Sequence, residues 1–78
     1  MKQWAKKSVL VLGLGETGLS LVRWLSEQGA SVRVADSRNN PPSLDILQKE
    51  FPKVEVHCGI YRSELQDGIQ LVAISPGV

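Results

Sequence analysis

Four short segments of the chain have the length and hydrophobic pattern of β-strands. The first, "SVLVLG" (8–13), is almost continuously apolar, which is typical of a strand buried on both faces of a parallel sheet. Two further segments alternate between apolar and polar side chains, namely "ASVRVAD" (30–36) and "VEVHCG" (54–59). The fourth predicted strand is "IQLVAIS" (69–75).

Segments of helical character separate these strands. From 17 to 28 the apolar positions recur at helical spacing, and Gly29 follows at the place of a C-cap glycine. Ser43 can cap a short second helix over 43–51. The segment 62–68 has room for about two helical turns.

The alternation of strands and helices predicts an α/β fold of the Rossmann-like, doubly wound class. Right-handed crossovers then give a parallel sheet with strand order 3-2-1-4. The helices at 17–28 and 43–51 would cover one face of this sheet, and only 62–68 would cover the other. The fourth strand would form an exposed edge, so we expect low stability and a tendency to self-associate.

Composition excludes several classes of protein. The 78 residues form one domain (1–78), and nine basic against eight acidic residues leave a net charge of +1. This balance gives no electrostatic reason to expect binding to nucleic acid or to a membrane surface. The single cysteine, Cys58, excludes an internal disulfide and fits a reducing compartment. No apolar run is long enough to span a membrane, and we expect a cytoplasmic protein.

Three glycines between the first strand and the first helix match the pattern G-x-G-x-x-G. Gly13 lets the strand turn sharply, Gly15 lets a ligand approach the backbone, and Gly18 lets the helix pack close to the strand. The amides of the first helical turn then lack partners, and the helix dipole adds about half a positive charge there. A diphosphate is the expected occupant, and the alternative is a tight turn that binds nothing.

An acidic residue ends the second strand. Asp36 lies 18 residues after Gly18, where dinucleotide-binding domains place a carboxylate that binds a ribose. The alternative is a turn former that caps the segment after the strand. Arg38 could stack on a base, pair with a phosphate, or be a solvated charge. These residues alone leave NAD, FAD and a nucleotide-sugar open as ligands.

Three segments together resemble the N-terminal domain of the Mur ligases. The best match is to the members of that family that add D-glutamate. The three segments are "GLGETGLS", "VADSRNNPP" and "ISPGV", and the resemblance extends from Lys7 to Val78. It implies that the ligand is the uridine diphosphate part of UDP-MurNAc-L-alanine. It also implies roles for individual residues. The amides of Glu16 and Thr17 would hold the diphosphate. The uracil and ribose would lie among Asp36, Ser37 and Arg38. The opposite wall of the site would be formed by Ser75, Pro76 and Gly77.

The resemblance further implies a reaction for which this sequence lacks an ATP-binding loop. In the family, ATP phosphorylates the substrate carboxylate with the help of Mg²⁺, and the amine of D-glutamate attacks the acyl phosphate. The sequence contains no G-x-x-x-x-G-K-[ST] loop for ATP, and no catalytic or metal-binding residue is assigned. We therefore expect a catalytically incompetent fragment that lacks the central and C-terminal domains. An NAD(P)-binding domain of an oxidoreductase and a dinucleotide-sensing regulatory domain are the alternatives.

Glu16 departs from what a diphosphate site requires. Its carboxylate lies in the glycine turn, and two anions at close range repel by several kcal/mol in a crevice of low dielectric. The side chain must therefore point to solvent or pair with a cation such as Arg38.

Overall fold

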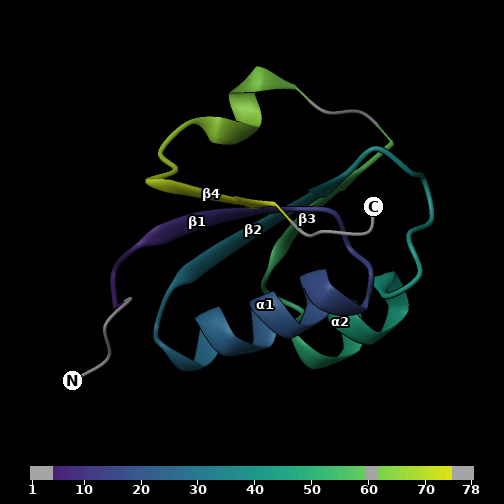
Figure 1. Ribbon diagram of the computed structural model, residues 1–78, viewed down its shortest axis with the longest axis horizontal. Coiled ribbons are helices and arrows are strands. Elements are labelled where there is room, and N and C mark those ends of the chain that lie inside the picture. Colours follow the sequence, from purple (N-terminus) through teal and green to yellow (C-terminus); the bar gives the residue numbers. More distant parts are fainter. Residues whose placement is uncertain (1–4, 60–61, 75–78) are drawn as a thin grey trace.

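The four predicted strands form one parallel sheet. The computed structural model describes residues 5–59 and 62–74. The sheet order is β3-β2-β1-β4, which confirms the predicted order (Figure 1). The strands are β1 (Ser8–Leu12), β2 (Ser31–Asp36), β3 (Glu55–Cys58) and β4 (Leu71–Ile74). All three pairings are parallel, so the carboxyl ends of the strands meet at one end of the sheet.

The two faces of the sheet are covered unequally, as predicted. Helices α1 (Glu16–Glu27) and α2 (Leu44–Glu50) lie on one face, and the 3₁₀ helix η1 (Ser63–Gln66) lies on the other (Figure 1). The larger core packs beneath the two α-helices, and its buried members are Val9, Val11, Leu14, Leu19, Val22, Leu25, Val34 and Leu47. On the η1 face the buried members are Leu10, Ala35 and Leu65. No helix in the described ranges combines the length and apolar character needed to cross a membrane.

Two helix boundaries test the capping predictions. Gly29 has a φ of 84°, and the N–H of Ala30 donates to the Leu25 carbonyl over 3.0 Å, which makes the expected glycine C-cap of α1. Ser43 does precede α2, but its side chain makes no capping hydrogen bond. The prediction that Ser43 caps this helix through its hydroxyl was therefore wrong, although the position of the helix start was right.

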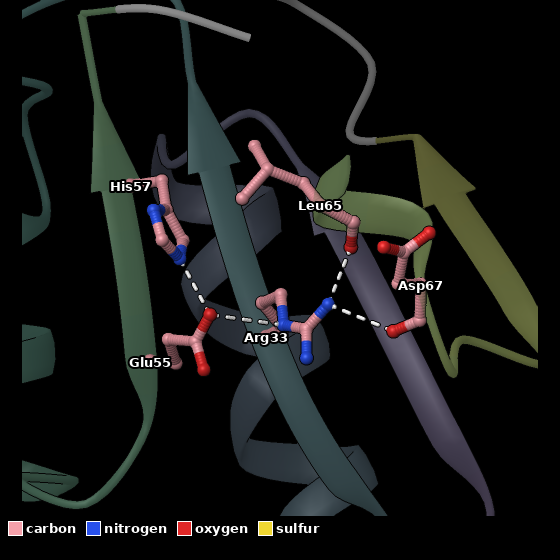
Figure 2. Close-up of polar contacts among 5 residues, drawn as sticks. All are labelled: Arg33, Glu55, His57, Leu65 and Asp67. Carbon is pink, nitrogen blue, oxygen red and sulfur yellow. Dashed lines mark hydrogen bonds and ion pairs between the residues drawn. The ribbon is translucent and has the colours of Figure 1, made fainter. Parts of the chain in front are cut away.

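The third helical segment is shorter than predicted, and Arg33 binds two carbonyls at its end. The prediction of about two turns over 62–68 is replaced by the single four-residue 3₁₀ helix η1. The guanidinium of Arg33, on β2, donates to the carbonyl oxygens of Leu65 (2.6 Å) and Asp67 (3.1 Å) (Figure 2). Both carbonyls lie among the last four of the predicted segment, where a helix has no N–H group of its own to bind them, so Arg33 fastens the end of this segment to β2. Gly68, with a φ of 77°, then turns the chain toward β4.

We expect Arg33→Met to lower the free energy of unfolding by about 1.5–3 kcal/mol, the usual range for hydrogen bonds to a charged group. The substitution keeps the aliphatic stem but removes both bonds to η1 and the ion pair with Glu55 (3.1 Å). Urea unfolding measures the change. Arg23→Met is the matched control, since the Arg23–Glu50 ion pair on the other face is exposed and should be worth less than about 1 kcal/mol. An equal loss in both variants would contradict the role of Arg33 as the link to η1.

Strand β4 forms an edge of the sheet. It pairs with β1, and the sheet order places no further described strand beyond it. Leu71, Val72 and Ile74 are exposed, and Ile74 most of all at 73%. An exposed apolar edge strand is a template for pairing with another chain.

We therefore expect the 78-residue chain to self-associate through β4, and Ile74→Lys to suppress this. A lysine on an edge strand opposes strand pairing because pairing would bury its charge. Ile46→Lys is the matched control, because Ile46 is an exposed isoleucine on α2, away from this edge. Sedimentation velocity over a range of concentrations measures the effect. A monomer at all concentrations, or equal suppression by both variants, would contradict the expectation.

Candidate functional site

The glycine turn has the predicted strand–turn–helix geometry. Gly13 follows β1 with a φ of 95°, a conformation that side chains rarely adopt. Its N–H donates to the carbonyl of Ala35 over 2.8 Å, which extends the pairing with β2 into the turn. Gly15 then occupies the N-cap position, and α1 begins at Glu16. Local sequence therefore sets both the sharp turn and the start of the helix.

The amino end of α1 offers N–H groups that the helix itself does not use. Gly15 accepts the first helical bond from the N–H of Leu19 (3.0 Å), but it has no side chain to cap the turn. The N–H groups that precede Leu19 have no carbonyl within the helix to bind. Glu16 and Thr17 are exposed and Gly18 is buried. The positive end of the helix dipole adds to these donors, so the turn is suited to an anion.

Gly15 differs from Gly13 because its backbone conformation does not require a glycine. Its φ of −97° is open to any residue. A Cβ added at this position would meet nothing within 4 Å. The folded chain thus has room for a side chain at Gly15, and a glycine there instead leaves the backbone open to a bound molecule.

Asp36 is buried and joins the glycine turn to the segment after β2. Its side chain is 0% exposed. The carboxylate accepts from the N–H of Leu14 through Oδ2 (2.8 Å) and from the N–H of Arg38 through Oδ1 (2.8 Å). The guanidinium of Arg38 completes the set, with Nε on Oδ1 at 2.9 Å and Nη2 on Oδ2 at 2.7 Å. The guanidinium and the two N–H groups hold the pKa of Asp36 well below its usual range, although burial opposes this.

These four bonds define what Asp36 can do. Two carboxylate oxygens accept about four hydrogen bonds in all, and the protein's own donors supply that number. The bond to the N–H of Arg38, two residues on, is the turn-forming contact that the sequence left as an alternative. Ser37 and Arg38 are exposed beside it, and Arg38 presents 42% of its side chain to solvent. We call residues 36–38 the Asp36–Arg38 corner.

Two residues that hold this site were not foreseen from the sequence. Gly59, after β3, donates its N–H to the carbonyls of Asp36 (3.0 Å) and Arg38 (3.1 Å). The N–H of Ser43 donates to the carbonyl of Leu14 (3.3 Å), which ties the glycine turn to the start of α2. The only signal for Gly59 was a glycine at the end of the predicted strand 54–59.

The remaining predicted site residues fall into two groups. Glu16 is exposed, and the guanidinium that was its candidate partner instead pairs with Asp36. The side chain therefore meets the first of the two conditions set for it, which is to point to solvent. The predicted opposite wall lies outside the described residues: Ser75, Pro76 and Gly77.

A cavity among the described residues lies elsewhere, on the η1 face beside β3. It has a volume of about 600 Å³ and is lined in part by Arg33, Glu55, His57, Arg62, Glu64 and Asp67. Its central groups bind one another: Glu55 pairs with Arg33 and with His57 (Figure 2). Among the described residues no group of three or more His, Cys, Asp or Glu side chains could hold a metal ion. The glycine turn is the better candidate for an anionic ligand, because its N–H groups have no acceptor within the helix.

Comparison with known proteins gives one consistent result. Residues 7–78 match the family described as Mur ligase MurD-like, N-terminal domain. A UDP-N-acetylmuramoylalanine--D-glutamate ligase from Nitrosomonas eutropha is 49% identical over 75 residues, or 96% of this chain. Enzymes of the same name from Aromatoleum aromaticum and Methylobacillus flagellatus are 54% identical over 92% of the chain and 50% identical over all of it. The chain spans 16–17% of the length of these relatives.

Proposed function

The chain belongs to the MurD-like N-terminal domain family of the Mur ligases, and from that premise we propose that it binds the UDP part of UDP-MurNAc-L-alanine. The observation that carries the proposal is the adjacency of two features. The N–H groups at the start of α1, which have no partner within the helix, lie next to the Asp36–Arg38 corner, because Leu14 in the glycine turn donates directly to Asp36.

The diphosphate is proposed to bind at the first turn of α1. The N–H groups of Glu16 and Thr17 would donate to its oxygens, and Thr17 would add its hydroxyl. Gly13 allows the sharp turn through its positive φ, and Gly15 leaves room for the phosphates. Gly18 is buried. The exposed carboxylate of Glu16 stays in solvent, which limits its repulsion of the phosphates.

The uridine is proposed to bind at the Asp36–Arg38 corner, with Ser75, Pro76 and Gly77 as the opposite wall. Asp36 forms the buried base of this corner, and Ser37 and Arg38 present exposed side chains above it. The same geometry disfavours NAD. In dinucleotide-binding domains the equivalent carboxylate accepts from the adenosine ribose. Here the four bonds to Asp36 already come from Leu14 and Arg38.

The whole protein is proposed to be the cytoplasmic, ATP-dependent ligase that adds D-glutamate to this precursor in peptidoglycan synthesis. Its relatives carry that name, and the chain covers about one sixth of their length, 16–17%. ATP and Mg²⁺ would be held by parts of the ligase outside these 78 residues, whose sequence has no Walker-type loop. No step of the ligation is assigned to this chain, and its proposed contribution is to hold the precursor.

Isothermal titration of the chain with UDP, NAD and NADP tests the proposal. We expect UDP to bind at least about tenfold more tightly than either dinucleotide, a difference of ~1.4 kcal/mol. Absolute affinity should be low, because a bound UDP would contact only this part of the ligase. NAD or NADP binding as tightly as UDP, or an absence of UDP binding, would contradict the proposal.

A further inference from the structure

Gly59 contacts the Asp36–Arg38 corner from the side opposite the glycine turn. It follows β3, whose last residue, Cys58, lies in register with Asp36 at the end of β2. Its N–H is shared between the carbonyls of Asp36 and Arg38, at 3.0 and 3.1 Å. The main chain of the corner is thus fastened to the residue after β3, while the carboxylate of Asp36 fastens it to the glycine turn after β1.

Only glycine fits at this position, for two separate reasons. Its φ is 92°, which strains any residue with a side chain. A Cβ built there would also lie 2.3 Å from Oδ1 of Asn39, the residue that follows the corner. A methyl group at 59 would therefore displace the side chain of Asn39, while the strain at a φ of 92° falls on the backbone whose N–H binds the corner.

We propose that Gly59 is a positioning residue for the nucleoside end of the site, an inference that rests on the proposed function. Gly59 does not touch the ligand in this scheme. It fixes the main chain that carries Ser37 and Arg38, so that their exposed side chains are already placed when uridine arrives. Gly59 makes none of the contacts that hold the glycine turn, which come from Ala35, the Asp36 carboxylate and Ser43.

The test compares Gly59→Ala with Gly68→Ala. Gly68 has a similar φ of 77°, but a Cβ there meets nothing within 4 Å, and it lies before β4, outside the corner. Both variants carry the same kind of backbone strain, and only the first displaces Asn39. Each is titrated with UDP and with inorganic pyrophosphate, and folding is checked by amide spectra and thermal unfolding.

We expect Gly59→Ala to weaken UDP binding by about tenfold and to leave pyrophosphate binding within about twofold. Gly68→Ala should change neither. Adding Asn39→Ala to Gly59→Ala should restore part of the UDP affinity, because both atoms near the added Cβ belong to Asn39. Equal losses of UDP and pyrophosphate, or no loss of either, would overturn the inference.

A second variant covers the case in which Gly59→Ala does not fold. Chemical synthesis can replace the Gly59 amide by an ester, which removes the shared N–H and keeps the conformational freedom of glycine. The same selective loss of UDP affinity is expected, and unchanged UDP affinity in the ester would overturn the inference. A chain that does not bind UDP before any change overturns the proposed function itself, and the two failures are therefore distinct.

Discussion

Replacing Asp36 by asparagine is expected to lower the free energy of unfolding by about 2–4 kcal/mol. An asparagine amide offers one acceptor oxygen and places an NH₂ where the second oxygen accepted. If the NH₂ replaces Oδ2 it faces the N–H of Leu14 and Nη2 of Arg38, and if it replaces Oδ1 it faces the N–H and Nε of Arg38. The Leu14 contact is buried, so losing it leaves an N–H group without water, whereas the half-exposed guanidinium of Arg38 regains solvent. At about 0.05–0.15 kcal/mol per residue, a domain of 78 residues has a total free energy of unfolding of about 4–12 kcal/mol. The expected loss is a large share of that total.

The loss of unfolding free energy in Asp36→Asn should decrease as the pH is lowered. The pKa of Asp36 is lowered in the folded chain, chiefly by the Arg38 side chain, so the charged form is favoured by folding. Its contribution is present above the unfolded value of about 3.9 and is lost as the pH falls below it. The difference between the unsubstituted chain and Asp36→Asn should therefore be largest near neutral pH and should shrink below about pH 4.

Urea unfolding at a series of pH values measures both effects. Asp67→Asn is the matched control, because Asp67 is exposed and Arg33 binds its backbone carbonyl rather than its side chain. We expect the control to change stability by less than about 0.5 kcal/mol. Equal losses in the two variants, or a difference that grows in acid, would contradict the role given to Asp36.

Replacing Gly15 by valine is expected to abolish UDP binding while leaving the fold intact. A Cβ at this position meets no protein atom within 4 Å, and the extended backbone suits a β-branched residue. The unfolding free energy should change by less than about 1 kcal/mol. The added methyl groups would occupy the space proposed for the diphosphate, so the dissociation constant for UDP should rise about 100-fold or more, ~2.7 kcal/mol.

The control for Gly15→Val is Ser20→Val, an exposed position on the same helix beyond its first turn. It adds a branched side chain of the same size away from the proposed phosphates. Thermal unfolding and UDP titration are measured on both variants. Retained UDP affinity in Gly15→Val would show that no ligand approaches this part of the backbone.

Local patterns were sufficient to predict the sheet and the glycine turn. Strand order follows from the alternation of elements and the handedness of crossovers, and the turn follows from the spacing of Gly13, Gly15 and Gly18. The hydrogen bond between the Asp36 carboxylate and the N–H of Leu14 could not be predicted, because the two residues are 22 positions apart and meet only in the folded sheet. The attachment of η1 to β2 depends in the same way on Arg33, whose guanidinium reaches the carbonyls of Leu65 and Asp67 across the sheet face.

The place of Gly59 was hidden for a related reason. A glycine after a strand is common, and only the fold shows that its N–H meets the carbonyls of Asp36 and Arg38. Sequence reasoning also assigned Asp36 to the ligand, since a carboxylate at that position binds ribose in dinucleotide-binding domains. The contacts with Leu14 and Arg38 add a structural task that spacing alone does not reveal.

The most direct measurement is an amide chemical-shift map of the ¹⁵N-labelled chain during titration with UDP. We predict the largest shifts at the start of α1 and at the corner, in Glu16, Thr17, Gly18, Ser37 and Arg38. The 600 Å³ cavity on the η1 face provides the competing location. Shifts confined to the residues around that cavity, such as Arg33, Glu55 and His57, with the glycine turn unchanged, would contradict the proposed site.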